Sequence, residues 1–145
     1  MEIVRTQEEY VVELFLKSAG KSLLTFRYFQ TRPTSVISGH LVTLVGVEGA
    51  DVIAYGHLDP EGGKTWLGVC VSEEWRGKGK GREIVSSLLE FGDRGGIVIS
   101  LAVDNDNIPA VKLYEAIGFE LTCKKTSTSF YQRAPKNGES TWPIH

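Results

Sequence analysis

The chain contains the stretch Val71-Ser-Glu-Glu-Trp-Arg76-Gly77-Lys78-Gly79-Lys80-Gly81-Arg82, which leads from an apolar segment into an amphipathic one. Alternating glycines permit backbone conformations and close approaches that other residues resist. The first N–H groups of a following helix have no partner within the helix, and the positive end of its dipole attracts anions. The stretch therefore predicts a phosphate or pyrophosphate site, although solvated hairpin turns also collect Gly and Lys.

The spacing of the glycines separates this turn from the common nucleotide-binding motifs. A dinucleotide fingerprint needs G-x-G-x-x-G, and a nucleotide P-loop needs G-x-x-x-x-G-K-[ST]. The three glycines here alternate strictly, so neither pattern fits. Four basic side chains would strengthen the grip of the turn on an anion: Arg76, Lys78, Lys80 and Arg82.

A different pattern, R-x-x-G-x-G, is filled by Arg76, Gly79 and Gly81. It resembles the acetyl-coenzyme A signature of the GNAT superfamily of N-acetyltransferases. A second block, from Asn107 to Phe119, resembles the superfamily's N-x-x-A-x-x-L-Y-x-x-x-G-F segment and follows one apolar strand later. Both blocks in this order make a specific match, whereas the first half of the chain carries no comparable signature.

Length and composition fit one domain. The chain has 145 residues, 41% of them hydrophobic, which suffices for one core. Its formal net charge of −2 argues against a broad nucleic-acid surface. We expect no membrane association, because no apolar run is long enough to span a bilayer and the first residues do not resemble a secretory leader. The two cysteines, Cys70 and Cys123, have neither metal-ligand spacing nor the density of a disulfide framework, so a cytoplasmic protein without a metal site is expected.

The resemblance implies an α/β fold with a mixed, mostly antiparallel twisted sheet of about six to seven strands flanked by about four helices. We expect one domain over residues 1–133 and a flexible tail over residues 134–145. Hydrophobic periodicity predicts strands over residues 41–47, 52–58, 65–71, 97–103, 120–125 and 127–132. It predicts helices over residues 6–20, 79–91 and 109–117, with a short helix or irregular segment over residues 22–34.

The resemblance also implies where the chemistry takes place. Amide formation from a thioester needs a neutral amine, a stabilised oxyanion and a proton for the departing thiolate. In the family, the strand before the basic turn splays from its neighbour to admit the cofactor, so backbone amides near Cys70 and Val71 would polarise the thioester carbonyl. Tyr114 matches the tyrosine that often protonates the thiolate; its alternative role is a packed helix aromatic. Asn107 would bond the cofactor arm or cap the helix that follows it.

Two histidines are candidates for the base that takes the proton of the amine. His57 lies late in the second of the central predicted strands, and His40 precedes the first of them. Each has a structural role as its alternative, and Glu73 and Asp59 are carboxylate alternatives. A covalent acetyl-enzyme on Cys70 is disfavoured, because family members mostly transfer directly and a strand cysteine is usually a small core residue.

The segment after the first predicted helix carries the candidate acceptor-binding side chains: Phe26, Arg27, Tyr28, Phe29 and Arg32. Aromatic faces stack on planar or sugar rings, and arginines grip phosphate or carboxylate. The predicted acceptor is therefore a small, anionic primary amine, with a nucleotide-linked amino sugar as the specific suggestion, unless the aromatics are simply core. A protein or peptide N-acetyltransferase and a non-catalytic acetyl-coenzyme A sensor remain as alternatives, in a monomer or a homodimer.

Overall fold

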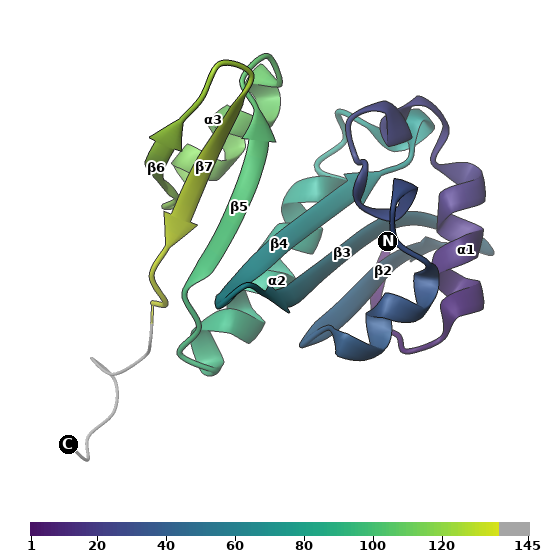
Figure 1. The fold of residues 1–145 in the computed structure, drawn as a ribbon. Helices are drawn as coiled ribbons and strands as arrows, with labels where there is room; N and C mark the ends of the chain where they lie inside the picture. Colours follow the sequence, from purple (N-terminus) through teal and green to yellow (C-terminus); the bar gives the residue numbers. More distant parts are fainter. Residues whose placement is uncertain (137–145) are drawn as a thin grey trace.

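The computed structural model describes residues 1–136, which fold around one seven-stranded sheet (Figure 1). The strands are β1 (Glu2–Arg5), β2 (Val42–Glu48), β3 (Asp51–Glu61), β4 (Lys64–Val71), β5 (Ile99–Asp104), β6 (Glu120–Lys124) and β7 (Thr128–Arg133). The α-helices are α1 (Glu9–Ser18), α2 (Lys80–Arg94) and α3 (Ile108–Ala116). The short 3-10 helices are η1 (Gly20–Leu24), η2 (Tyr28–Gln30), η3 (Thr34–Gly39) and η4 (Glu73–Trp75). The predicted fold class is confirmed.

Strand order in the sheet is β1-β2-β3-β4-β5-β7-β6. All neighbouring strands are antiparallel except β4 and β5, which are parallel. This parallel pair is joined only at Thr65–Ile99 and Trp66–Ser100. Beyond these pairs the two strands diverge toward their carboxyl ends, as Figure 1 shows. The sheet therefore has an opening beside the last residues of β4, as the resemblance implied.

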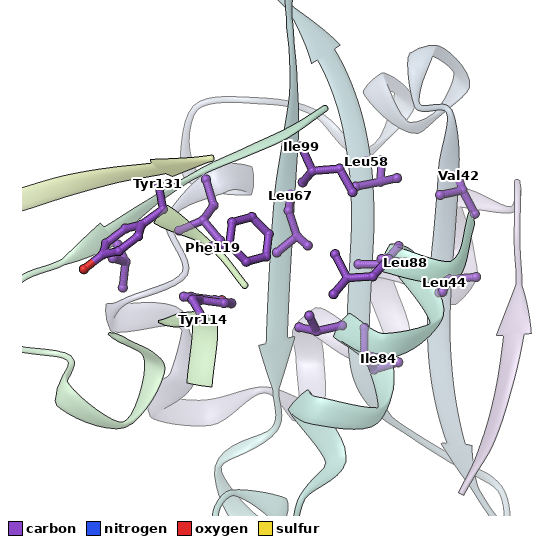
Figure 2. Close-up of a cluster of buried hydrophobic side chains, with 14 of the residues drawn as sticks. Val42, Leu44, Leu58, Leu67, Ile84, Leu88, Ile99, Tyr114, Phe119 and Tyr131 are labelled. Atoms are coloured by element: carbon purple, nitrogen blue, oxygen red, sulfur yellow. The ribbon is translucent and has the colours of Figure 1, made fainter. Parts of the chain in front are cut away.

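Helices cover the two faces of the sheet. Side chains alternate between the faces of a strand, so Tyr55 and Leu58 of β3 join different core clusters. Tyr55 packs with Phe15 of α1, whose ring centroid lies 5.8 Å away. Leu58 packs on the other face with Ile84 and Leu88 of α2 (Figure 2). Each of these two α2 side chains is fully buried, which stabilises the fold by about 2 kcal/mol apiece.

Helix α3 belongs to the same core cluster as α2. Its Tyr114 and the following Phe119 lie with their ring centroids 5.7 Å apart in an edge-on contact. Figure 2 shows both side chains together with Tyr131 of β7. The packing fixes α3 beside the diverging end of β5, so residues of α3 can reach the opening.

The predicted tail over residues 134–145 lies mostly outside the described residues. Within residues 1–136, the backbone N–H of Lys136 donates to Asp93 at 2.9 Å, which holds the chain after β7 against the end of α2. No helix among these residues has the length and apolar character needed to cross a bilayer.

Candidate functional site

The glycine-rich turn leads into α2 through two residues with left-handed backbone. Gly77 has φ +75° and Gly79, the N-cap of α2, has φ +79°. A Cβ added at either position would meet none of the described residues within 4 Å, so conformation rather than space requires glycine there. No side chain within residues 1–136 caps this helix, which leaves the amides of its first turn free to bind an anion.

The turn forms one wall of a cavity of about 470 Å³. All the predicted cofactor residues line it except Lys78, whose ammonium instead lies 5.0 Å from the ring centroid of Trp75. Val69, Trp75 and Leu113 give the cavity an apolar part beside its basic turn. An uncapped helix end with basic side chains suits a pyrophosphate, and the apolar part suits a slender arm. The cavity therefore fits coenzyme A.

The backbone direction of β4 determines which amides face the opening. Just beyond the β3–β4 ladder, which pairs without a register shift, the N–H of Ser72 donates to the carbonyl of Ile53 at 2.8 Å. In an antiparallel ladder the backbone groups of every second residue point to the same neighbour. Those of Cys70 therefore point to β3, whereas those of Val69 and Val71 point into the opening. The backbone N–H of Val71 therefore faces the opening, in line with the prediction, and the N–H of Val69 faces it as well.

A second cleft, of about 360 Å³, lies on the other side of the opening. It is lined by Arg27 and Tyr28 from the segment after α1, by His57 of β3 and by Trp66 of β4. The residues that line both this cleft and the larger cavity are Thr25, Phe26, Val69, Asn107, Ala110 and Tyr114. The two spaces thus meet where β4 and β5 diverge, so groups bound in each would come together there.

Tyr114 lies at this junction and is 7% exposed. Burial raises the pKa of its phenol to about 12, so the hydroxyl keeps its proton at neutral pH. The ring also packs on Phe119, as the structural alternative for this residue requires, and its role as the acid stays a prediction. Asn107 caps α3, accepting from the backbone N–H of Ala110 at 3.4 Å, and its bond to a cofactor arm stays a prediction.

His57 is the histidine that lines the smaller cleft. Its imidazole is 2% exposed, and its Nδ1 lies 2.6 Å from the hydroxyl of Tyr55. The other ring nitrogen, Nε2, lies over Gly68, where an added Cβ would be only 2.5 Å away. Burial, with a further contribution from His40, lowers the pKa of His57 well below its usual value. The imidazole is therefore neutral at pH 7 and able to accept a proton.

His40 does not line the cleft, and both its ring nitrogens are occupied. Its Nδ1 lies 2.9 Å from the hydroxyl of Thr43, and its Nε2 lies 2.7 Å from the hydroxyl of Tyr28. The Tyr28 hydroxyl donates its own proton to Asp59 at 2.8 Å, so Nε2 must act as the donor. This arrangement makes His40 a support for Tyr28. Its predicted role as a base stays untested.

The predicted acceptor arginines are already paired with carboxylates. Arg27 donates two hydrogen bonds to Asp104 at the end of β5, at 3.1 and 3.3 Å. Arg32 lies over the ring of Tyr28, 4.3 Å from its centroid, and reaches Glu61 at 3.4 Å. An anionic acceptor would have to compete with these carboxylates.

Phe29 and Cys70 both pack in the core cluster that contains Tyr55, the structural role that the sequence left open for each. Phe29 does not line the cleft; its ring packs edge-on against Tyr55, with centroids 5.5 Å apart. Cys70 is 6% exposed, and burial raises the pKa of its thiol to about 12. The thiol is thus protonated at neutral pH, which disfavours a covalent route through it.

The cleft also contains residues that were not singled out in the sequence. Trp66 and Gly68 share a face of β4 with Cys70, so strand alternation alone could have placed them beside the opening. Thr25 and Asp104 lie in irregular or strand-end positions, and no motif marks them. Their contribution to the site depends on contacts between distant segments.

Comparison with known proteins agrees with the two motifs. The family model of the acetyltransferase (GNAT) family matches residues 8–119. A mycothiol acetyltransferase of Thermobifida fusca is 41% identical over 69 residues, which are 47% of this chain and 20% of that protein. The L-amino acid N-acetyltransferase AaaT of Escherichia coli is 36% identical over 57 residues, 38% of this chain and 35% of that protein. The chain thus spans only a fifth to a third of these curated relatives.

Among solved structures, the PaiA N-acetyltransferase of Thermoplasma acidophilum in complex with coenzyme A superposes with a TM-score of 0.73. The superposition covers 92% of this chain and 99% of that one at 16% identity. At this identity it shows that the two proteins share a fold. The family match, the diverging strands and the uncapped glycine turn agree: the chain belongs to the acetyltransferase (GNAT) family, whose cofactor is acetyl-coenzyme A.

Proposed function

We propose that this protein transfers the acetyl group of acetyl-coenzyme A to a primary amine of a small molecule. The observation that carries the proposal is the meeting of two cavities at Tyr114 and Val69. One cavity has the basic turn, and the other has a buried neutral imidazole, so donor and acceptor would approach from opposite sides. Such positioning converts an encounter of two molecules into a reaction within one complex.

Backbone and side-chain groups near the junction have separate roles in direct transfer. Acetyl-coenzyme A supplies the thioester. The backbone N–H groups of Val69 and Val71 face the opening, where they would stabilise the negative charge on the carbonyl oxygen. Nε2 of His57 takes the proton of the attacking amine, directly or through water, and Tyr114 gives its proton to the departing thiolate.

Three features support a small acceptor over a peptide. The cleft is only about 360 Å³, and the Arg27–Asp104 pair links its two sides. Both relatives described above bear the names of small-molecule acetyltransferases. The charged groups around the cleft include both signs, so a zwitterion or an amino sugar carrying an anionic group is compatible with it. A nucleotide-linked amino sugar remains the specific suggestion.

Turnover with a panel of acceptors tests the proposal. The protein would be incubated with acetyl-coenzyme A and, separately, with amino sugars, amino acids, peptides and polyamines, while release of free thiol is followed. We expect thiol release with at least one small amine and a matching acetylated product by mass spectrometry. Turnover confined to peptides would favour the peptide enzyme. Tight binding of acetyl-coenzyme A without turnover on any amine would favour the sensor.

A further inference from the structure

Ser22 is a buried polar residue beside the cofactor cavity. It lies in η1 and is 5% exposed, and its Oγ has no hydrogen-bond partner among the residues that the structure describes. Buried hydroxyl groups are nearly always hydrogen-bonded, because leaving one without a partner is destabilising. This unpaired hydroxyl therefore requires an explanation.

Two backbone carbonyls close to Ser22 in the sequence already accept other hydrogen bonds. The carbonyl of Ser22 already accepts from the N–H groups of Thr25 and Phe26 and from the Thr25 hydroxyl. The carbonyl of Ala19 accepts from the N–H groups of Ser22 and Glu73. These acceptors are committed to the turns that shape η1.

Contacts with η4 hold η1 beside the glycine-rich turn. The Glu73 carboxylate accepts from the backbone N–H of Lys21 at 2.9 Å. Gly20 has φ +63°, and an added Cβ there would lie 2.7 Å from that same carboxylate. Because η4 directly precedes the glycine-rich turn, these contacts hold Ser22 at a fixed place close to the anion site.

Ser22 lines the 470 Å³ cavity together with Val69, Val71 and Trp75. In this structure the hydroxyl oxygen is closed to solvent, so it has to turn about χ1 to face the cavity. We infer that, once turned, it hydrogen-bonds an amide of the pantetheine arm of coenzyme A. The arm carries amide groups into this partly apolar wall, where each needs a hydrogen-bond partner, and a hydroxyl can either donate or accept. The inference rests on the cofactor of the family and not on which amine is the acceptor.

The substitution Ser22→Ala tests this assignment through two measurements that do not depend on turnover. We expect the dissociation constant of coenzyme A, measured by calorimetry, to rise about tenfold. The melting temperature of the free protein should rise by about 2–4 °C, because an unpaired buried hydroxyl is removed. The affinity loss should be equal for coenzyme A and acetyl-coenzyme A, since both carry the arm.

Ser18→Ala is the matched control. The Ser18 hydroxyl donates to the carbonyls of Phe15 and Val52, at 3.0 and 2.8 Å, so its loss should lower the melting temperature and leave cofactor affinity unchanged. An unchanged affinity in Ser22→Ala would overturn the inference, as would a loss of affinity accompanied by a lower melting temperature. A loss confined to acetyl-coenzyme A would place the bond at the thioester and overturn the assignment to the arm.

Discussion

Tyr114 has a protonated hydroxyl at the junction of the two cavities, as the proposed acid requires. We expect Tyr114→Phe to lower kcat by about 100-fold while the dissociation constant of coenzyme A changes less than about twofold, because the ring and its packing remain. Steady-state kinetics and calorimetry would measure the two effects. Tyr131→Phe is the control: its hydroxyl bonds Glu115 at 2.9 Å, outside both cavities, and its kcat should be normal. Normal turnover in Tyr114→Phe would assign the acid elsewhere.

His57 gives the reaction its expected dependence on pH. A base must be unprotonated, and burial lowers the pKa of this imidazole well below 6.5. The value of kcat/KM should therefore be constant near pH 7 and fall only as the pH drops through that lowered pKa. In His57→Gln we expect a lower kcat/KM without this acidic limb. His40→Gln should keep the limb, and an unaltered limb in His57→Gln would remove His57 from the mechanism.

The N-terminus of α2 is the element that should hold the pyrophosphate, and Gly79 sets its geometry. A β-branched side chain is strained at φ +79°, so Gly79→Val should turn the first amides of α2 away from the ligand. We expect coenzyme A to bind at least tenfold more weakly by calorimetry. Gly62→Val imposes similar strain, at φ +62° in the β3–β4 turn with nothing within 4 Å, and should leave binding unchanged. Equal affinity in both variants would show that the turn does not bind the cofactor.

Elements governed by local sequence were predicted well, and those governed by distant contacts were not. The glycine turn, α2 and the β2–β3 hairpin carry their own signals in turn residues and periodicity. Strand β1 was missed because it is four residues long and is defined by its pairing with β2 at the sheet edge. Arg27 was predicted as a ligand for an anion, yet its partner is Asp104, 77 residues away. A local sequence pattern cannot predict such a long-range pairing. It also cannot predict that the hydroxyl of Ser22 is buried without a partner.

At the scale of the whole molecule, the sheet consists of two parts that meet along β4 and β5. Only two residue pairs join these strands, and the Arg27–Asp104 ion pair links the same two parts within the lining of the cleft. The pair is partly exposed, since the Arg27 side chain is 52% exposed, so its net contribution to stability is only about 0.2–1 kcal/mol. Its main effect should be on which acceptors can enter.

Breaking this ion pair should widen the range of acceptors without unfolding the protein. In Asp104→Ala we expect the ratio of kcat/KM for peptide amines to that for small amines to rise at least about fivefold, while the melting temperature changes by less than about 4 °C. Competition kinetics with paired acceptors would measure the ratio. Glu90→Ala breaks another exposed pair, Glu90–Arg94 on α2, outside both cavities, and should leave the ratio unchanged. If Asp104→Ala also leaves it unchanged, the shape of the cleft excludes large acceptors without help from this pair.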